Sequence, residues 1–430
     1  MRAIATITML LFPFLLVGAA PRDPSLREKL GWIEQKIVSD DGAASDQFGR
    51  AVVVRGDVAI VGSPNSTIDG HEGQGAVYVF TRSGGIWSQT QKLVASDGAA
   101  GDVFGIAVAM SDVTAIVGAY SSSSYRGSAY VFTLSGGTWS ESQKLTTDDA
   151  APFDQFGWSV ALDGDIALIG AQGAAIDGNN GQGAVYAFAR SGGTWTQSDK
   201  FTSDDGAAAD SFGWSVSLDG TNAVVGTGFP TVGGNILQGA AYTFTESGGV
   251  WTQTQKLVAS NGAAYDFFGL SVAIEGDTIL VGADGAATDG DPFSNQGVAY
   301  VFMNSGGSWA ETQQLTGSDG QPSDAFGEWV AIEGDRALVG ATGVSVNGND
   351  GQGAAYLFSR SGAIWSEVLR FVSSDGAEND QFGWEVALSG DTLLMGAYNA
   401  NVEDRIGQGA AYFYSLPPSD ILFQDGFDDA

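Results

Sequence analysis

The sequence predicts an all-β protein, a seven-bladed β-propeller of four-stranded antiparallel blades that is closed by its N-terminal strand. Three observations predict this fold: a recurring Phe-Gly pair, a four-strand pattern inside each repeat, and a series of tryptophans that begins one strand early. Phe-Gly recurs at steps of 52 to 58 residues, and repeats of this length bury their apolar faces against neighbouring units. The repeated phenylalanines are Phe48, Phe104, Phe156, Phe212, Phe268, Phe326 and Phe382.

The third repeat shows the strand pattern most clearly. Four strand-like segments are separated by turn residues such as Asp163-Gly164, which suit the tight connection of paired antiparallel strands. The second segment is apolar enough to be buried on both faces. The expected strands cover residues 156–162, 166–171, 183–188 and 195–201. Four antiparallel strands per unit, repeated seven times, predict a seven-bladed propeller.

The tryptophan that opens the fourth strand indicates how the ring closes. After the first Phe-Gly it occurs six times, at Trp87, Trp139, Trp195, Trp251, Trp309 and Trp365. The seventh is Trp32, which precedes the first Phe-Gly, whereas the last repeat stops after its third strand at 410–414. We therefore expect the segment around Trp32 to supply the outer strand of the seventh blade, which would remove an exposed sheet edge.

The charge of the chain limits its partners. It has 50 acidic and 18 basic residues, a net charge of −32, which repels nucleic acid and anionic membranes and favours cations, basic partners or simple solubility. It has no cysteine, which excludes disulfides, thiolate metal sites and cysteine nucleophiles.

The N-terminus is typical of a secretory signal peptide. An apolar run at 3–18 follows Arg2, and the small residues Val17 and Ala19 favour cleavage after Ala19. No later segment has transmembrane length. We expect a signal peptide at 1–19, a linker at 20–30, the propeller at 31–415 and a C-terminal tail at 416–430, in a secreted, periplasmic or cell-surface monomer.

These residues carry a resemblance to a known family. The chain resembles FG-GAP repeat proteins, whose best-known members form the head of integrin α-subunits. The resemblance covers residues 31 to 415 and implies a seven-bladed propeller with an adhesive or ligand-binding role. Besides the seven Phe-Gly pairs, it rests on a second-strand Gly-Ala at Gly118, Gly170, Gly282, Gly340 and Gly396.

The chain departs from the family at the calcium loop. Many members carry Asp-x-Asp-x-Asp-Gly between the first two strands of a blade, where the oxygens suit calcium. Here that connection shrinks to turns at 163–165, 275–277, 333–335 and 389–391, and two residues cannot surround an ion. We expect no cofactor, and calcium stays an open alternative. The tripeptide Arg55-Gly56-Asp57 falls at the same hairpin position, so we interpret it as a turn rather than as an adhesive ligand.

The longer loops provide the candidate binding residues. Strands alternate in direction, so the connections from strand two to three and from strand four to the next blade share one acidic face, where binding loops are usually found. An aspartate two residues before each Phe is expected to cap loop N–H groups. The strand two-to-three loops carry six acidic residues with two possible interpretations: they are ordinary turn residues, or they make weak contacts to a cation or ligand. These residues are Asp69, Asp177, Asp289, Asp291, Asp350 and Asp404.

The sequence offers little for catalysis. His71 is the only histidine, so neither a multi-histidine zinc site nor a serine–histidine triad can be argued. The leading hypothesis is a non-catalytic binding or adhesion propeller that recognises a protein or glycan partner, at the cell surface or in the medium, through the acidic loop face. A lectin-like propeller that holds sugars with Trp, Tyr and Asp or Asn is the alternative, followed by an enzyme acting on polysaccharide.

Overall fold

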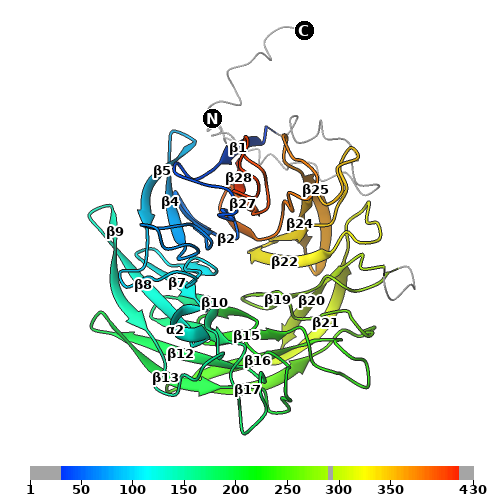
Figure 1. Ribbon diagram of the computed structural model, residues 1–430. Helices are drawn as coiled ribbons and strands as arrows, with labels where there is room; N and C mark the ends of the chain where they lie inside the picture. Colours follow the sequence, from blue (N-terminus) through cyan, green and yellow to red (C-terminus); the bar gives the residue numbers. More distant parts are fainter. Residues whose placement is uncertain (1–30, 289–293, 416–430) are drawn as a thin grey trace, which may run out of the picture.

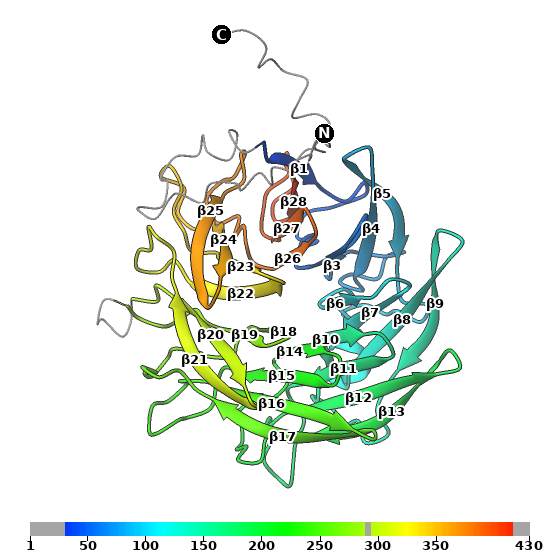
Figure 2. The ribbon, with the colours of Figure 1, turned by 180° about the vertical axis from the view of Figure 1, so that it is seen from behind.

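The computed structural model describes residues 31–288 and 294–415 of the 430-residue chain, and these form a seven-bladed β-propeller (Figures 1 and 2). Seven separate four-stranded sheets are arranged around one axis, and every neighbouring pair of strands is antiparallel. The expected signal peptide, the linker at 20–30 and the tail at 416–430 lie outside the described residues, as do Asp289 and Asp291. None of the helices in the described ranges is long and apolar enough to cross a membrane.

The innermost strand of each blade follows its Phe-Gly pair and faces the axis. In the third and sixth blades this strand begins at the phenylalanine itself. The innermost strands are β2 (Ala51–Arg55), β6 (Val108–Met110), β10 (Phe156–Asp163), β14 (Ser215–Asp219), β18 (Val272–Glu275), β22 (Phe326–Glu333) and β26 (Val386–Ser389).

The second and third strands form the buried middle of each blade, because both of their faces pack against neighbouring sheets. The second strands are β3 (Val58–Ser63), β7 (Thr114–Ala119), β11 (Ile166–Ala171), β15 (Asn222–Thr227), β19 (Thr278–Ala283), β23 (Arg336–Ala341) and β27 (Thr392–Ala397). The third strands are β4 (Ala76–Ser83), β8 (Ser128–Ser135), β12 (Ala184–Ser191), β16 (Ala240–Ser247), β20 (Val298–Ser305), β24 (Ala354–Ser361) and β28 (Ala410–Ser415).

The fourth strand forms the rim of the ring, and its exposed polar side chains alternate with buried ones, which include the tryptophan. Six of these strands follow the third strand of their own blade, and the seventh comes from the N-terminus. They are β5 (Ile86–Leu93), β9 (Thr138–Leu145), β13 (Thr194–Phe201), β17 (Val250–Leu257), β21 (Ser308–Leu315), β25 (Ile364–Phe371) and β1 (Ile33–Ile37).

The N-terminal strand closes the ring, as predicted. β1 pairs with β28 from Ile33 opposite Ser415 to Ile37 opposite Ala411, and the sheet order is β1-β28-β27-β26. The Trp32 ring packs edge-on against Phe371 of the preceding blade at 5.5 Å. Sequence positions at the two ends of the propeller are therefore joined within one sheet, and β28 is not left as a free edge.

Each Phe-Gly pair joins two blades. The Phe104 ring is fully buried and meets Tyr130 of its own blade edge-on at 5.4 Å. Its backbone N–H donates to the carbonyl oxygen of Gln74 in the preceding blade at 2.9 Å. The glycine is needed because a Cβ on Gly105, where φ is +95°, would lie 2.5 Å from the carbonyl oxygen of Ala76. The Phe-Gly pair recurs in every blade of this chain because it forms the contact between neighbouring blades.

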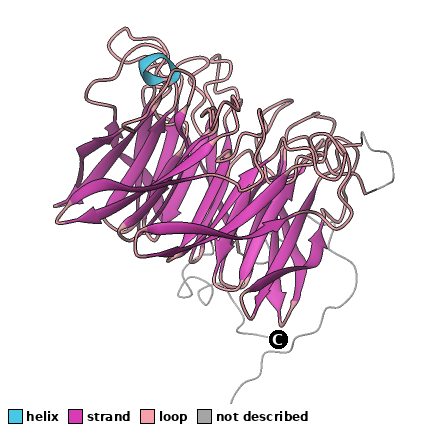
Figure 3. Ribbon diagram, turned by 90° about the horizontal axis from the view of Figure 1, so that it is seen from below, coloured by secondary structure: helices cyan, strands magenta, loops and turns pink. Residues whose placement is uncertain are grey.

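The two faces of the ring differ as expected (Figure 3). On the turn face, two-residue hairpins join strands one to two and three to four, as at Asp163–Ile166 and Ser191–Thr194. On the loop-rich face lie the longer connections from strand two to three and from strand four to the next blade, including the short helical turn α2 (Ser122–Tyr125). The innermost strands enter from the loop-rich face, so the residues directly after Phe-Gly lie at that end of the central channel.

Candidate binding site at the mouth of the central channel

A cavity of about 130 Å³ lies on the axis of the ring. We call it the channel-mouth cavity. Its wall is built from one repeated position, the residue after Phe-Gly, which every blade directs toward the axis. The floor contains valines two residues further along, among them Val108, Val160, Val216 and Val272. The residues at the repeated position are Arg50, Ile106, Trp158, Trp214, Leu270, Glu328 and Trp384.

One side of the cavity carries its charged groups. The Arg50 guanidinium carbon lies 4.5 Å from the ring centroid of Trp384 and 5.7 Å from that of Tyr398, within the range of cation–π attraction. Burial lowers the pKa of Arg50, and the nearby Glu385 and Glu328 act in the opposite direction. Because a guanidinium keeps its proton in proteins, Arg50 is a fixed positive charge in the wall.

Two carboxyl groups, Glu385 and Glu328, lie near this cation, and a third, Asp284, lies near Glu328. Burial disfavours the ionised forms of all three. Burial raises the pKa of Glu385 to about 8, although Arg50 and the backbone N–H of Val52 oppose the shift. Burial, and then the charge of Glu328, raise the pKa of Asp284 to about 7. Burial also raises the pKa of Glu328, whose Oε2 accepts a hydrogen bond from Thr342 at 2.7 Å. Near neutral pH the cluster therefore holds both protonated and ionised carboxyl groups.

Two polar atoms in this region are buried without a hydrogen-bond partner among the described residues. They are the Trp384 indole nitrogen, a donor, and Asp284 Oδ1. A buried polar group without a partner costs free energy, and in native proteins such groups are exceptions that need an explanation. Trp384 lines the channel-mouth cavity, so an acceptor on a ligand there would satisfy its indole nitrogen, whereas Asp284 does not line the cavity.

The other side of the cavity is aromatic. The Trp158 ring lies 4.8 Å from Tyr120 and 4.7 Å from Trp214, and the Trp214 ring lies 4.9 Å from Phe229. All four rings are half-buried, so part of each remains open to a ligand. A mainly apolar wall with a few convergent polar groups is the usual composition of a ligand pocket.

The loop carboxylates proposed from the sequence are not brought together. Asp69, Asp177, Asp350 and Asp404 are exposed and lie in the strand two-to-three loops of four different blades. Asp69 and Asp177 adopt φ of +50° at the first central position of tight turns such as Ile68–His71. No group of three or more His, Asp or Glu side chains suited to a metal ion occurs in the described part of the chain. The geometry of these residues is that of turns.

The aspartate two residues before each Phe caps its loop. In all seven blades its Oδ2 accepts the N–H of the residue three positions earlier, at 2.7 to 2.9 Å. Burial raises the pKa of each of these carboxyl groups. They are Asp46, Asp102, Asp154, Asp210, Asp266, Asp324 and Asp380. Their side chains are engaged in the fold.

A second set of loop acids is paired at the blade junctions. Asp205, for example, accepts hydrogen bonds from Tyr242 at 2.8 Å and Lys256 at 2.6 Å. The same Tyr–Asp–Lys triad occurs with Asp41, Asp97, Asp149 and Asp375. At Asp319 an arginine, Arg370, takes the place of the lysine. In the fifth blade the neutral residues Asn261 and Gln314 stand in place of the aspartate and the lysine. Much of the acidity on the loop-rich face is therefore structural.

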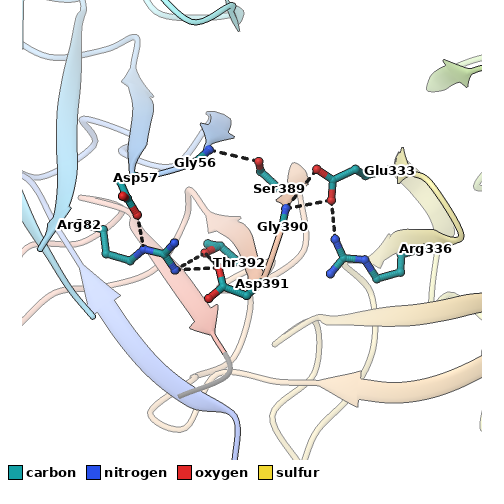
Figure 4. A network of polar contacts seen from close by, with 9 residues as sticks. All are labelled: Gly56, Asp57, Arg82, Glu333, Arg336, Ser389, Gly390, Asp391 and Thr392. Carbon is teal, nitrogen blue, oxygen red and sulfur yellow. Dashed lines mark hydrogen bonds and ion pairs between the residues drawn. The ribbon is translucent and has the colours of Figure 1, made fainter. Parts of the chain in front are cut away.

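The Arg55-Gly56-Asp57 tripeptide forms the first hairpin of the turn face, and its three residues are engaged within the protein. Arg55 pairs with Asp112 of the next blade, and the N–H of Gly56 donates to Ser389 Oγ at 3.2 Å. Asp57 accepts from Arg82 at 2.7 Å. Figure 4 shows the surrounding network, in which Arg82 also binds Asp391 and Thr392 while Glu333 receives the N–H of Gly390 and pairs with Arg336. The turn interpretation of the tripeptide agrees with these contacts.

The channel-mouth cavity was not predicted from the sequence, because the candidate binding residues were taken from the loops. Its signal lies inside the repeat: Phe-Gly is constant, but the next residue is basic, acidic, aliphatic or aromatic in different blades. Because the residue after Phe-Gly varies between blades, its side chain is not required for the packing that the Phe-Gly pair provides. Glu385 and Trp329, one residue further along, replace small residues at the same position of other blades.

Comparison with protein families agrees with the repeat geometry. A family model described as FG-GAP repeat matches the chain seven times and covers well over half of it. The matched residues are 32–80, 87–132, 139–188, 195–244, 251–302, 309–358 and 365–414. Each match begins at the rim tryptophan of one blade and ends in the third strand of the next blade. The sequence repeat is therefore offset by one strand from the structural blade, and this offset is why the N-terminal strand completes the last blade. A search of curated proteins finds no match to the chain.

Proposed function

Because the chain belongs to the FG-GAP repeat family, we propose that it is a non-catalytic binding protein that recognises a protein or glycan partner through the loop-rich face of its propeller. The observation that carries the proposal is the channel-mouth cavity, where seven blades direct dissimilar side chains to one point of that face. Concave sites with aromatic walls and few polar groups are typical of binding pockets. The longer loops around this mouth offer a surface for a larger partner.

The polar groups of the cavity support binding rather than catalysis. Glu328 is held by Thr342 and Glu385 by the N–H of Val52, so each carboxyl group is engaged by the fold. The expected signal peptide supports a location outside the cytoplasm, where the partner would be met at the cell surface or in the medium. The high negative charge argues against a nucleic-acid partner.

A capture experiment with variants on the two faces tests this function. The mature protein is immobilised and exposed to envelope and medium fractions of the producing cells, and the bound material is identified. A double variant, Trp158→Ala with Trp214→Ala, alters the cavity, whereas Ile86→Ala alters an exposed residue of the turn face. We expect a specific partner to be retained by the wild type and by Ile86→Ala and lost by the cavity variant. Equal retention by all three proteins contradicts the assignment of the binding face.

A further inference from the structure

Seven aromatic side chains form a continuous arc across the second to fifth blades on the loop-rich face. Successive ring centroids are separated by 5.7, 6.3, 4.8, 4.7, 4.9 and 6.2 Å. We call these residues the aromatic arc. In order they are Phe153, Tyr125, Tyr120, Trp158, Trp214, Phe229 and Phe267. The arc passes through the channel-mouth cavity, since Trp158 and Trp214 belong to both.

The arc is open to solvent along its length. Phe153 is 67% exposed and Tyr125 is 43% exposed, and the five other rings are half-buried. Large aromatic side chains at a protein surface lose the free energy that burial would provide. Phe153 adopts a positive φ, +74°, as the residue three positions before the repeated Phe does in every blade, and Tyr125 adopts one of +62°. The fold thus leaves two large aromatic rings exposed at one end of the arc.

The groups opposite the arc indicate an uncharged ligand. Arg50 already occupies the space over Trp384 and Tyr398, so a ligand cation would meet a fixed positive charge. A ligand anion would meet Glu328 and the net charge of −32. Arg50 and the Trp384 indole offer donors, whereas Glu328 offers acceptors. This mixture suits a neutral group that carries several hydroxyls, since a hydroxyl both donates and accepts.

A sugar ring combines these requirements. One face of a pyranose presents C–H groups that pack on an aromatic ring, and its edge carries hydroxyls for polar partners. A volume of about 130 Å³ is close to that of an engineered cavity of about 150 Å³ that binds benzene, so the cavity takes one ring-sized group and not a chain. Further units of a polymer would have to continue outside, where the aromatic arc lies.

We propose that the channel-mouth cavity binds one residue of an uncharged glycan and that the glycan chain continues along the aromatic arc. This inference rests on the proposed function and names the ligand of the same site. Trp158 and Trp214 provide the stacking surface, and Arg50 with Glu328 orients the hydroxyls. The glycan is retained by stacking on successive rings, so affinity rises with the number of sugar units.

Binding to defined glycans tests the proposal. The full chain is screened on an array of neutral, sialylated and sulfated glycans, and neutral hits are titrated by calorimetry as the methyl glycoside and as the tetrasaccharide. We expect saturable binding to neutral glycans, with the tetrasaccharide bound at least about tenfold more tightly than the methyl glycoside. Binding restricted to charged glycans, or equal affinity for the two lengths, overturns the proposal.

Variants locate the site and control for folding. Trp214→Ala should weaken binding at least about tenfold, as truncation of a central aromatic contact does, whereas Trp214→Phe keeps a stacking surface and should restore most of it. Ile364→Ala, at an exposed position of the turn face, should bind as the wild type does. Equal affinity of wild type and Trp214→Ala, at matched melting temperatures, overturns the site.

Two outcomes separate this inference from the proposed function. If no glycan binds but a captured protein partner is lost by the cavity variant, the glycan assignment is wrong and the function of the loop-rich face stands. If neither glycan nor partner depends on the cavity, both are wrong. Methylguanidinium serves as a cationic probe, and saturable binding of this probe in place of sugars also overturns the proposal.

Discussion

Phe48 donates its backbone N–H to the carbonyl oxygen of Gln408 at 2.8 Å, although the two residues belong to the first and last repeats of the chain. The bond is the same one that joins Phe104 to Gln74 and Phe382 to Gln352. The seam between the last and first blades is therefore built like the seams between consecutive blades. Together with the pairing of β1 and β28, it makes the ring continuous.

Removal of β1 should open this ring. A chain that begins at Phe48 lacks the partner of β28, so an unpaired edge and the buried rings of Tyr412 and Tyr414 become exposed. We expect a melting temperature several degrees lower and concentration-dependent aggregation, measured by calorimetry and light scattering. A chain that begins at Gly31 keeps β1 and is the control. Equal melting of the two chains is incompatible with closure by β1.

Glycine in the second strand should be irreplaceable for a steric reason. A Cβ on Gly340 would lie 1.9 Å from the carbonyl oxygen of Gly383 in the next blade, so Gly340→Ala must push two blades apart and should cost about 3 kcal/mol or more in unfolding free energy. Gly334 is the matched control, because its φ is +58° but its Cβ would meet nothing within 4 Å. Gly334→Ala should cost only about 1 kcal/mol of backbone strain. Denaturant titrations measure both, and similar costs would refute the steric account.

The fifth blade allows a junction triad to be built rather than removed. There Asn261 and Gln314 stand where other blades have Asp and Lys beside the tyrosine. Restoring the charges with Asn261→Asp and Gln314→Lys should stabilise the protein by at most about 1 kcal/mol at pH 7, because the pair is partly exposed. The single variants complete a double-mutant cycle. A coupling of zero would show that the triads do not contribute to stability.

The pH dependence of that triad follows from its natural counterparts. Burial opposes ionisation of Asp205, but the hydrogen bonds from Lys256 and Tyr242 outweigh it and hold the pKa below its ordinary value. A lowered folded-state pKa gives stability that is present above the unfolded value and is lost as the pH falls through the folded value. The gain from the double variant should therefore be complete at pH 7, begin to fall near pH 4 and be lost as the pH falls through the lowered folded-state pKa.

Glu385 should give the opposite pH dependence. Burial raises its pKa to about 8 in the folded protein, so the stabilisation is full below the unfolded value and is lost as the pH rises through about 8. Glu385→Gln cannot lose a proton and should resist alkaline pH better, by roughly 4 kcal/mol between pH 5 and 9. The exposed Glu378→Gln is the control. Parallel stability profiles of wild type and Glu385→Gln would show that the carboxyl group does not titrate in this range.

Calcium removal should leave the melting temperature unchanged. The connection that carries calcium in many family members is a two-residue turn here, as at Asp163–Ile166, whereas calcium needs six or more oxygen ligands. Thermal melting with calcium and with a chelator measures the effect, since an ion bound to the folded state alone raises the melting temperature. A shift of several degrees between the two conditions would reveal a calcium site and refute the argument from the turns.

The loop residues show which contacts could be predicted from short sequence patterns: those between residues close together in the chain. Asp46 and its equivalents were predicted to cap loop N–H groups, and the structure places them there, because a cap joins residues only three positions apart. The turn at Arg55-Gly56-Asp57 was predicted for the same reason. The role of Asp205 was not, because its partners Tyr242 and Lys256 come from other parts of the repeat.

The sequence by itself determined the number of blades, their four-strand order, the closing strand around Trp32 and the two unequal faces, because each follows from spacing and from local turns. Only the tertiary structure decided that Arg50, Glu328 and Glu385 lie close together, since they come from three different blades. The physical reason is the geometry of closure: packing seven twisted sheets into a ring sets the distances across its centre, and no contact between near neighbours in the chain encodes those distances.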